Sequence, residues 1–155
     1  MNQPYSERYE KNGLKLVRIL KNGGSTIAKN GKEVNDLWGY AVGGFTSEVV
    51  MMDIAVLEYM AKHGHFKGLG KIYSSFVTVF KSIIKATGGQ ATHIGFWIDK
   101  GKLYIDATKQ IVNYNDAIAE ATKRKQLSIW DFANERLIWR TGEGKNDWNI
   151  KRKGE

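Results

Sequence analysis

Lysine, histidine and glycine side chains gather in one short segment, and together these residue types can hold a phosphate-bearing anion. The segment reads KHGHFKGLGK, from Lys62 to Lys71. Glycines allow backbone N–H groups to approach an anion, and the N-terminus of a helix adds partial positive charge. We expect residues 65–70 to form a loop and Lys71 to begin a helix behind it. The candidate anion-binding residues are Lys62, His63, His65, Lys67, Gly68, Gly70, Lys71, Lys81 and Lys85.

The charge pattern around this segment is one-sided. Between Glu58 and Asp99 there is no acidic residue, whereas five lysines and all three histidines lie there, in a chain with a net charge of +8. A basic chain favours acidic partners such as nucleic acid, nucleotides or an acidic protein. The alternative, that the charge serves solubility and the lysines are merely solvated, stays open.

The same segment does not fit a P-loop, because its spacing from Gly64 is one residue too long and Ile72 replaces the Ser or Thr that would hold magnesium. His63 and His65 form a His-x-His pair, but a catalytic zinc site usually needs three protein ligands, and nothing in the sequence places His93 beside them. We therefore predict no metal and no cofactor, and expect the histidines to help hold phosphate.

No pattern of residues identifies a reaction. The sequence has no serine nucleophile motif, no His-Glu metal motif and no paired acids, and Asp99 and Asp106 fall near predicted turns and strand ends, where aspartate commonly closes turns. We predict no catalytic residue and a non-enzymatic protein. Convergence of a histidine with a carboxylate in one pocket would reverse this prediction.

Aromatic residues are numerous, with five Trp, seven Tyr and six Phe. Phe96, Trp97, Trp130 and Trp139 lie in predicted strands, where packing in the core is the ordinary outcome. We assign none of the aromatic residues as a stacking surface for bases.

The predicted elements indicate an α+β fold, mainly an antiparallel sheet of hairpins with two or three helices packed on one face. Residues 1–140 are expected to form a single domain, followed by a loosely held basic tail at 141–155. The predicted strands are 14–20, 26–29, 37–45 with a glycine break at 43–44, and the hairpins 93–98/103–107 and 127–132/136–140. The predicted helices are 48–63 with Ser47 as its cap, 71–86 in preference to a strand there, and 116–125 capped by Asn113 or Asn115.

Composition points to a protein of the cytoplasm. The chain has no cysteine, its first residues are too polar for a signal peptide, and its most apolar segment, 72–84, is too short and too polar to span a bilayer. We predict no association with a membrane and make no prediction of oligomeric state.

Four short motifs resemble a small uncharacterised domain of bacteriophage and prophage proteins. They are Gly39-Tyr-Ala-Val42, the pair Ile94-Gly-Phe-Trp-Ile-Asp99 and Leu103-Tyr-Ile-Asp106, Asn115-Asp-Ala117, and Gln126-Leu-Ser-Ile-Trp-Asp131. The resemblance implies a mobile-element origin, hence the host cytoplasm, and transfers no catalytic residue. Residues 64–92 depart from the pattern, so the predicted anion-binding segment would be this chain's own addition.

Two functions follow as hypotheses. The first is a phage or mobile-element accessory protein that binds a phosphate-bearing anion, either nucleic acid or a signalling nucleotide, with a role against host defence. The second is a protein-binding inhibitor or accessory factor that docks on an acidic host or phage protein.

Overall fold

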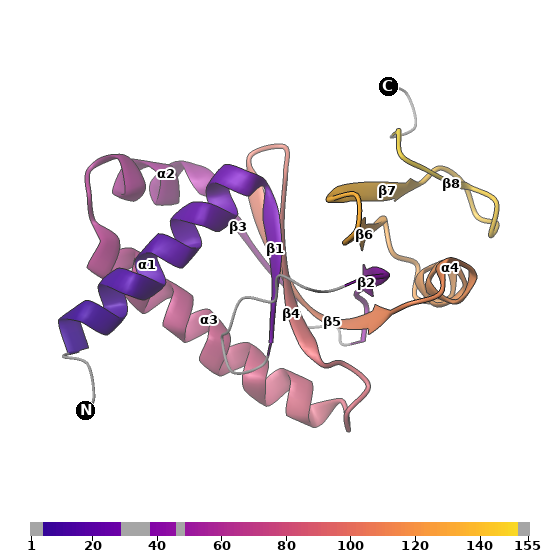
Figure 1. The fold of residues 1–155 in the computed structure, drawn as a ribbon, viewed down its shortest axis with the longest axis horizontal. Helices are drawn as coiled ribbons and strands as arrows, with labels where there is room; N and C mark the ends of the chain where they lie inside the picture. The colour runs from indigo at the N-terminus through magenta and orange to yellow at the C-terminus, as the bar shows by residue number, and fades with distance from the viewer. Residues whose placement is uncertain (1–4, 29–37, 46–48, 152–155) are drawn as a thin grey trace.

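The computed structural model describes residues 5–28, 38–45 and 49–151. Within these ranges the chain forms four helices and an antiparallel sheet of eight strands, which confirms the predicted α+β class (Figure 1). The helices are α1 (Tyr5–Asn22), α2 (Ile54–Lys62), α3 (Phe66–Ala86) and α4 (Tyr114–Lys123). The strands are β1 (Gly24–Ala28), β2 (Tyr40–Val42), β3 (Val49–Asp53), β4 (His93–Asp99), β5 (Lys102–Ile111), β6 (Ser128–Asp131), β7 (Arg136–Arg140) and β8 (Trp148–Asn149).

The long strand β5 belongs to two regions of the sheet. Its first part pairs with β4 on one side and with β3 on the other, and β1 completes this first sheet region beside β4. Its last residues, 109–111, pair with β2, which continues through β6 and β7 to β8 and makes the second sheet region. The order β1-β4-β5-β2-β6-β7-β8 therefore turns from one region into the other at β5.

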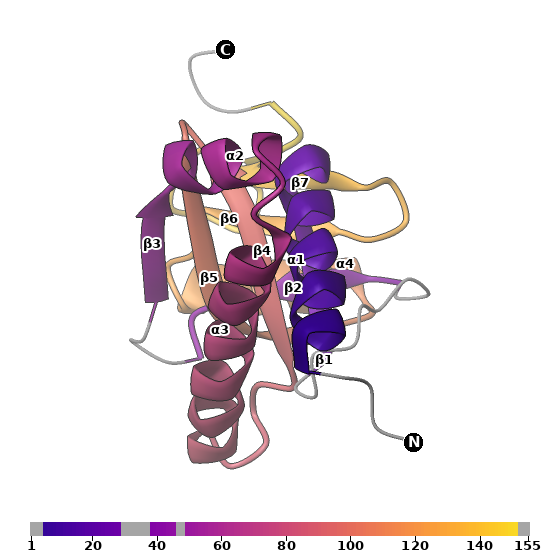
Figure 2. The ribbon, with the colours of Figure 1, turned by 90° about the vertical axis from the view of Figure 1, so that its left-hand side faces the viewer.

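Helices α1, α2 and α3 cover one face of the first sheet region (Figure 2). Side chains alternate along a strand, so Ile94, Phe96 and Ile105 point to these helices while their neighbours point to the opposite face. The ring of Phe96 stacks on Tyr73 of α3, with centroids 6.2 Å apart. No helix of the described residues covers the opposite face, as Figure 1 shows.

Two glycines let α1 and α3 approach each other closely. A Cβ on Gly13 would overlap the carbonyl oxygen of Phe66, and a Cβ on Gly70 would overlap that of Tyr9. Glycine is required wherever one backbone comes this near to another. Gly70 therefore serves helix packing in this fold.

A second, smaller core lies under α4. It joins Val42, Ile118, Ile129 and Ile138 to Trp148, whose indole N–H donates to Thr122 Oγ1 at 3.1 Å. Since β8 pairs with β7 and Trp148 is only 8% exposed, residues 148–149 of the predicted loosely held tail pack against the second sheet region.

Several element predictions are confirmed. The hairpin β4–β5, the hairpin β6–β7, the helix over 71–86 and the helix α4 all form, and Asn113 Oδ1 caps α4 by accepting the N–H of Asp116 at 3.1 Å. A short strand also forms within 26–29, as part of β1, and β2 lies within 37–45.

Other element predictions are wrong. Residues 14–20 belong to helix α1, where Leu16 and Ile19 are buried at helical spacing, and the apparent alternation came from too short a window. Residues 49–53 form strand β3 instead of a helix, and α2 begins only at Ile54, whose N–H is bonded to the carbonyl of Gly101 at 3.1 Å. The expected cap at Ser47 lies outside the described residues.

Candidate functional site: a pocket between two sheet faces

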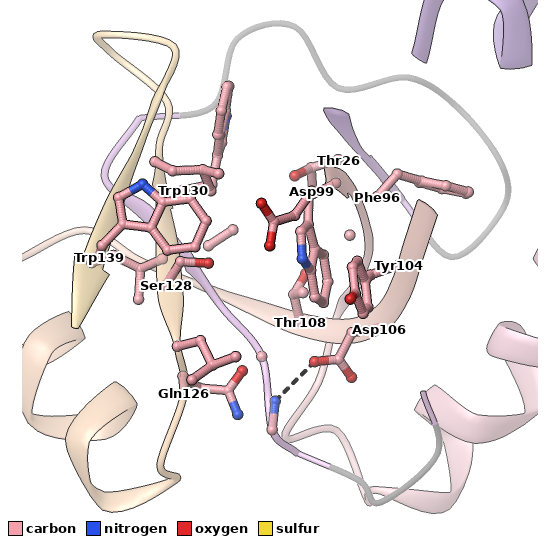
Figure 3. Close-up of a pocket in the computed structure, with 18 of the residues that line it drawn as sticks. Thr26, Phe96, Asp99, Tyr104, Asp106, Thr108, Gln126, Ser128, Trp130 and Trp139 are labelled. Carbon is pink, nitrogen blue, oxygen red and sulfur yellow. Dashed lines mark hydrogen bonds between the residues drawn. The ribbon is translucent and has the colours of Figure 1, made fainter. Parts of the chain in front are cut away.

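The uncovered faces of the two sheet regions meet at an angle and enclose a pocket of about 330 Å³. A pocket of this size falls at the lower end of the range for small-molecule sites. Figure 3 shows Tyr104, Asp106 and Thr108 of β5 on one side of it and Ser128, Trp130 and Trp139 of β6 and β7 on the other.

The first wall is the free face of β1, β4 and β5. Gly95 lies opposite Asp106, and Trp97 lies opposite Tyr104, in the β4–β5 ladder. The rings of Trp97 and Tyr104 are stacked almost in parallel, with an interplanar angle of 8° and centroids 5.3 Å apart. Because Gly95 has no side chain, no side chain from this position fills the pocket beside the aromatic pair.

The second wall comes from the residues of β6 and β7 that point away from α4. Ile129 and Ile138 enter the second core, so the alternate residues Trp130 and Trp139 turn to the pocket. The expectation that Trp97, Trp130 and Trp139 pack in the core is wrong, because each of them lies on the uncovered face of its strand. Phe96 alone of the four is a core residue.

Asp106 is the most unusual polar group of the pocket. It is only 2% exposed, and its Oδ1 has no hydrogen-bond partner, the one such case among buried side chains in the described residues. Its Oδ2 accepts the N–H of Gly44 at 3.1 Å. Burial raises the pKa of Asp106 to about 6, although backbone hydrogen bonds from Gly44 and Ala107 oppose this shift.

Two glycines at the end of β2 make room for this carboxylate. A Cβ on Gly43 would overlap Asp106 Oδ2, and Gly44 has a φ of +81°, which L side chains rarely adopt. The glycine break predicted at 43–44 therefore has a definite role, since it brings a backbone N–H to a buried carboxylate.

Polar groups from the end of α4 complete this part of the pocket. Gln126 Oε1 lies 2.9 Å from the point that a Cβ on Gly43 would occupy, so it lies near the Asp106 carboxylate. Gln126 Nε2 donates to the carbonyl of Arg124 at 3.2 Å. The Arg124 guanidinium lies over the ring of Phe45, 3.7 Å from its centroid, and donates to the carbonyl of Gly44 at 3.3 Å.

The charge of the lining differs from that of the whole protein. Asp99 and Asp106 lie in the pocket, and Lys125 supplies a cation to its lining. A bare phosphate would not be favoured beside two carboxylates. The arrangement suits a flat apolar ring that carries hydrogen-bond donors.

The predicted anion-binding residues lie elsewhere, on α2 and α3 behind the first sheet region. The prediction of a loop at residues 65–70 and of a helix start at Lys71 is wrong, because α3 begins at Phe66 and includes both Gly68 and Gly70. His63 and His65 are exposed in the short α2–α3 connection. The exposed lysines are Lys62, Lys67, Lys71, Lys81 and Lys85.

Four of these lysines share one side of α3. Lys71, Lys81 and Lys85 follow Lys67 by 4, 14 and 18 positions, which are close to whole numbers of turns at about 3.6 residues per turn. We call Lys62, Lys67, Lys71, Lys81 and Lys85 the basic helix surface. Four of these lysines are spread along one side of α3 and Lys62 lies at the end of α2, and the sheet separates all five from the pocket.

Among the described residues, the histidines do not converge on a carboxylate. His63 lies against the ring of Tyr59, with centroids 4.3 Å apart, and His93 is half-buried with its Nδ1 2.7 Å from Thr92 Oγ1. Burial lowers the pKa of His93. In the part of the chain that the structure describes, no three His, Asp or Glu side chains gather as a metal site would require.

Sequence reasoning missed the pocket, although a signal for it was present. Trp97, Tyr104 and Asp106 are spaced so that β4 and β5, once paired, place all three on one face. The hairpin was predicted, and its register would have shown two aromatic residues and a carboxylate opposite the apolar residues Ile94, Phe96 and Ile105.

Comparison with known protein families, with curated proteins and with solved structures found no match. The resemblance to a phage domain thus stays a prediction. Within the described residues, no helix combines the length and the hydropathy of a membrane span.

Proposed function

We propose that this protein is a non-enzymatic binding protein for nucleotides or nucleic acid, and that the pocket between the two sheet faces holds the base. The observation that carries the proposal is the set of aromatic rings, Trp97 with Tyr104 on one wall and Trp130 with Trp139 on the other. Bases stack on aromatic side chains, and each stacked base contributes about 1–3 kcal/mol.

The charges of the pocket support one direction for such a ligand. The carboxylates of Asp99 and Asp106 favour a ring with N–H donors inside, and the phosphate would lie at Lys125, which is exposed. The protein would act in the cytoplasm, and in a host cell if it is phage-encoded, where holding a signalling nucleotide would counter host defence.

The basic helix surface would serve a longer ligand. It lies on the far side of the first sheet region, so it cannot touch the phosphate of a mononucleotide in the pocket. A nucleic-acid strand can reach both places, and its phosphates would be held by the five lysines, with His63 and His65 beside them.

The proposal is tested by titration calorimetry with GMP and AMP at low salt. At least one should bind, and Trp130→Ala should weaken that binding on the order of tenfold or more because one stacking ring is lost. Trp38→Ala is the matched control, because Trp38 is 69% exposed and does not line the pocket. Absence of binding, or an equal loss in both variants, would contradict the proposal.

The salt dependence of binding distinguishes the pocket from the basic helix surface. Replacement of Lys62, Lys67 and Lys71 by Ala should leave mononucleotide affinity unchanged. The same triple variant should bind single-stranded oligonucleotides more weakly and with a smaller dependence on salt, since fewer counterions are released. If the triple variant behaves as the wild type with oligonucleotides, the basic helix surface has no part in binding.

The second candidate function, docking on an acidic protein, is favoured by one observation. Val56 and Tyr59 on α2 are 62% and 61% exposed and lie on the same helix as Lys62, so an apolar patch adjoins the basic helix surface. A stoichiometric protein partner that is recovered from host lysate and lost in Tyr59→Ala, but kept in Trp130→Ala, would support this function.

A further inference from the structure

We infer that the pocket selects a guanine-type base, whose edge presents two neighbouring N–H donors to Asp106 and Gln126. This inference rests on the proposed base-binding function and goes beyond it by naming the ring and the residues that choose it.

Asp106 is a buried acceptor that lines the pocket. A buried acceptor without a partner costs on the order of 1–3 kcal/mol, and folded proteins rarely leave one. Asp106 Oδ1 is such an acceptor, in a side chain that lines the pocket. Oδ1 itself is closed to solvent, so a ligand would reach the carboxylate at Oδ2, which accepts one N–H, from Gly44, and has acceptor capacity for another. A donor at Oδ2 offsets the burial of the carboxylate, and donors are therefore the groups that this end of the pocket favours.

Gln126 supplies a second acceptor beside Asp106. Its Oε1 and Asp106 Oδ2 both lie around the point where Gly43 lacks a Cβ. Since Nε2 of Gln126 is engaged by the carbonyl of Arg124, its oxygen is the atom turned to Gly43. Two acceptors side by side match two donors side by side, which are the ring N–H and the adjacent amino group of guanine.

Adenine does not match these two acceptors. On the corresponding edge adenine has a ring nitrogen that accepts hydrogen bonds, and this lone pair would face the acceptor Asp106. A site built for a donor rejects an analogue that lacks it, because the buried polar group is then left unpaired. The aromatic walls stack on either purine, so the discrimination falls on Asp106 and Gln126.

The charged groups around Asp106 are compatible with this role. Asp99 and Lys125 line the same pocket, Arg124 is held behind Gly44 by its bond to the Gly44 carbonyl, and Tyr104 and Thr108 are its neighbours on the free face of β5. Burial raises the pKa of Asp106 to about 6, which is still below 7.5. At pH 7.5 its carboxyl is therefore ionised and accepts hydrogen bonds.

The test compares GMP, IMP and AMP with the wild-type protein at pH 7.5 by titration calorimetry. GMP should bind on the order of ten- to a hundredfold more tightly than AMP, and IMP, which keeps the ring N–H and lacks the amino group, should lie between them. Asp106→Asn keeps the shape and offers a donor in place of an acceptor, so it should abolish the preference for GMP. Thermal melting shows whether that variant is folded. If it is not, the comparison of GMP, IMP and AMP on the wild-type protein still tests the inference.

Each other outcome has a defined meaning. Equal binding of all three nucleotides, with loss in Trp130→Ala, would overturn the inference and leave the proposed function intact. Binding of none of them would overturn both. Tighter binding of tetramethylammonium than of GMP would also overturn both, and would identify the rings as a site for quaternary ammonium groups.

Discussion

Asp106 and Gly44, which are 62 residues apart in the chain, are joined by a hydrogen bond of 3.1 Å from the Gly44 N–H to Asp106 Oδ2. The bond ties the free face of the first sheet region to the residues that follow β2 in the second. The contact and the glycines that permit it therefore form one part of the pocket wall.

The first prediction concerns Gly43→Ala. The new Cβ would overlap Asp106 Oδ2, so either the carboxylate or the end of β2 must move. We expect a loss of about 1–3 kcal/mol in the free energy of unfolding, as is usual for overpacking, and a loss of nucleotide binding. Urea denaturation and calorimetry measure the two effects.

Gly68→Ala is the control for that variant. A Cβ on Gly68 would meet only the flexible end of Met60, and Gly68 lies inside α3, where alanine is favoured over glycine by about 1 kcal/mol. Stability should stay unchanged or rise. If Gly68→Ala destabilises the protein as much as Gly43→Ala does, the close approach at Gly43 is not the cause.

Hairpins and the helix cap were predictable from the sequence because their signals are local. Asn113 precedes its helix directly, and the turn at Lys100-Gly101 lies between two strands that pair residue by residue. Both residues of that turn have positive φ, at 50° and 74°. Such features depend on a few adjacent residues, which a sequence presents together.

The pocket was not predictable in the same way, since it depends on pairing between distant strands. Whether Trp130 faces a core or a cavity is decided by α4, which covers the other face of β6, and by the turn of the sheet at β5. Helix α1 was missed for a different reason, because the window 14–20 was too short to show the helical spacing that the whole segment from Tyr5 to Asn22 carries.

A second prediction is that Asp106 makes stability depend on pH. Its pKa in the folded protein is about 6, above the value of 3.8 expected for an exposed aspartate, so the folded state holds the proton more tightly. The stabilisation is complete below pH 4 and is lost as the pH rises from 4 to 6. Its size is on the order of 3 kcal/mol.

This pH dependence is measured by urea denaturation between pH 4 and pH 8. Asp106→Asn cannot ionise, so its stability relative to the wild type should increase over that interval and stay constant above pH 7. A constant difference from pH 4 to pH 7 would show that the carboxyl of Asp106 does not titrate abnormally.

A third prediction is the pH dependence of nucleotide binding. A donor on the Asp106 carboxylate stabilises its ionised form and lowers its pKa in the complex. GMP affinity should therefore fall as the pH falls through 6, by about tenfold for each pH unit at most, while AMP affinity stays nearly level. Calorimetry at pH 5, 6 and 7.5 measures this, and parallel curves for the two nucleotides would contradict it.

A fourth prediction concerns the end of the chain. Trp148→Ala should cost about 3–5 kcal/mol, since it removes a large buried side chain and its hydrogen bond to Thr122 Oγ1. Trp130→Ala, which removes a partly exposed ring from the pocket wall, should cost much less. Thermal melting of the two variants compares them directly, and similar melting temperatures would mean that the second core does not need β8.

The last prediction tests the contact between α1 and α3. Gly13→Ala and Gly70→Ala should each destabilise the protein, on the order of 1–3 kcal/mol, because each Cβ would overlap a carbonyl oxygen of the other helix. Since one variant pushes the helices apart and makes room for the second, the double variant should lose less than the sum of the single losses. Urea denaturation of the three variants measures this coupling. Gly70→Ala with unchanged stability and weaker binding of oligonucleotides would instead return Gly70 to the predicted anion site.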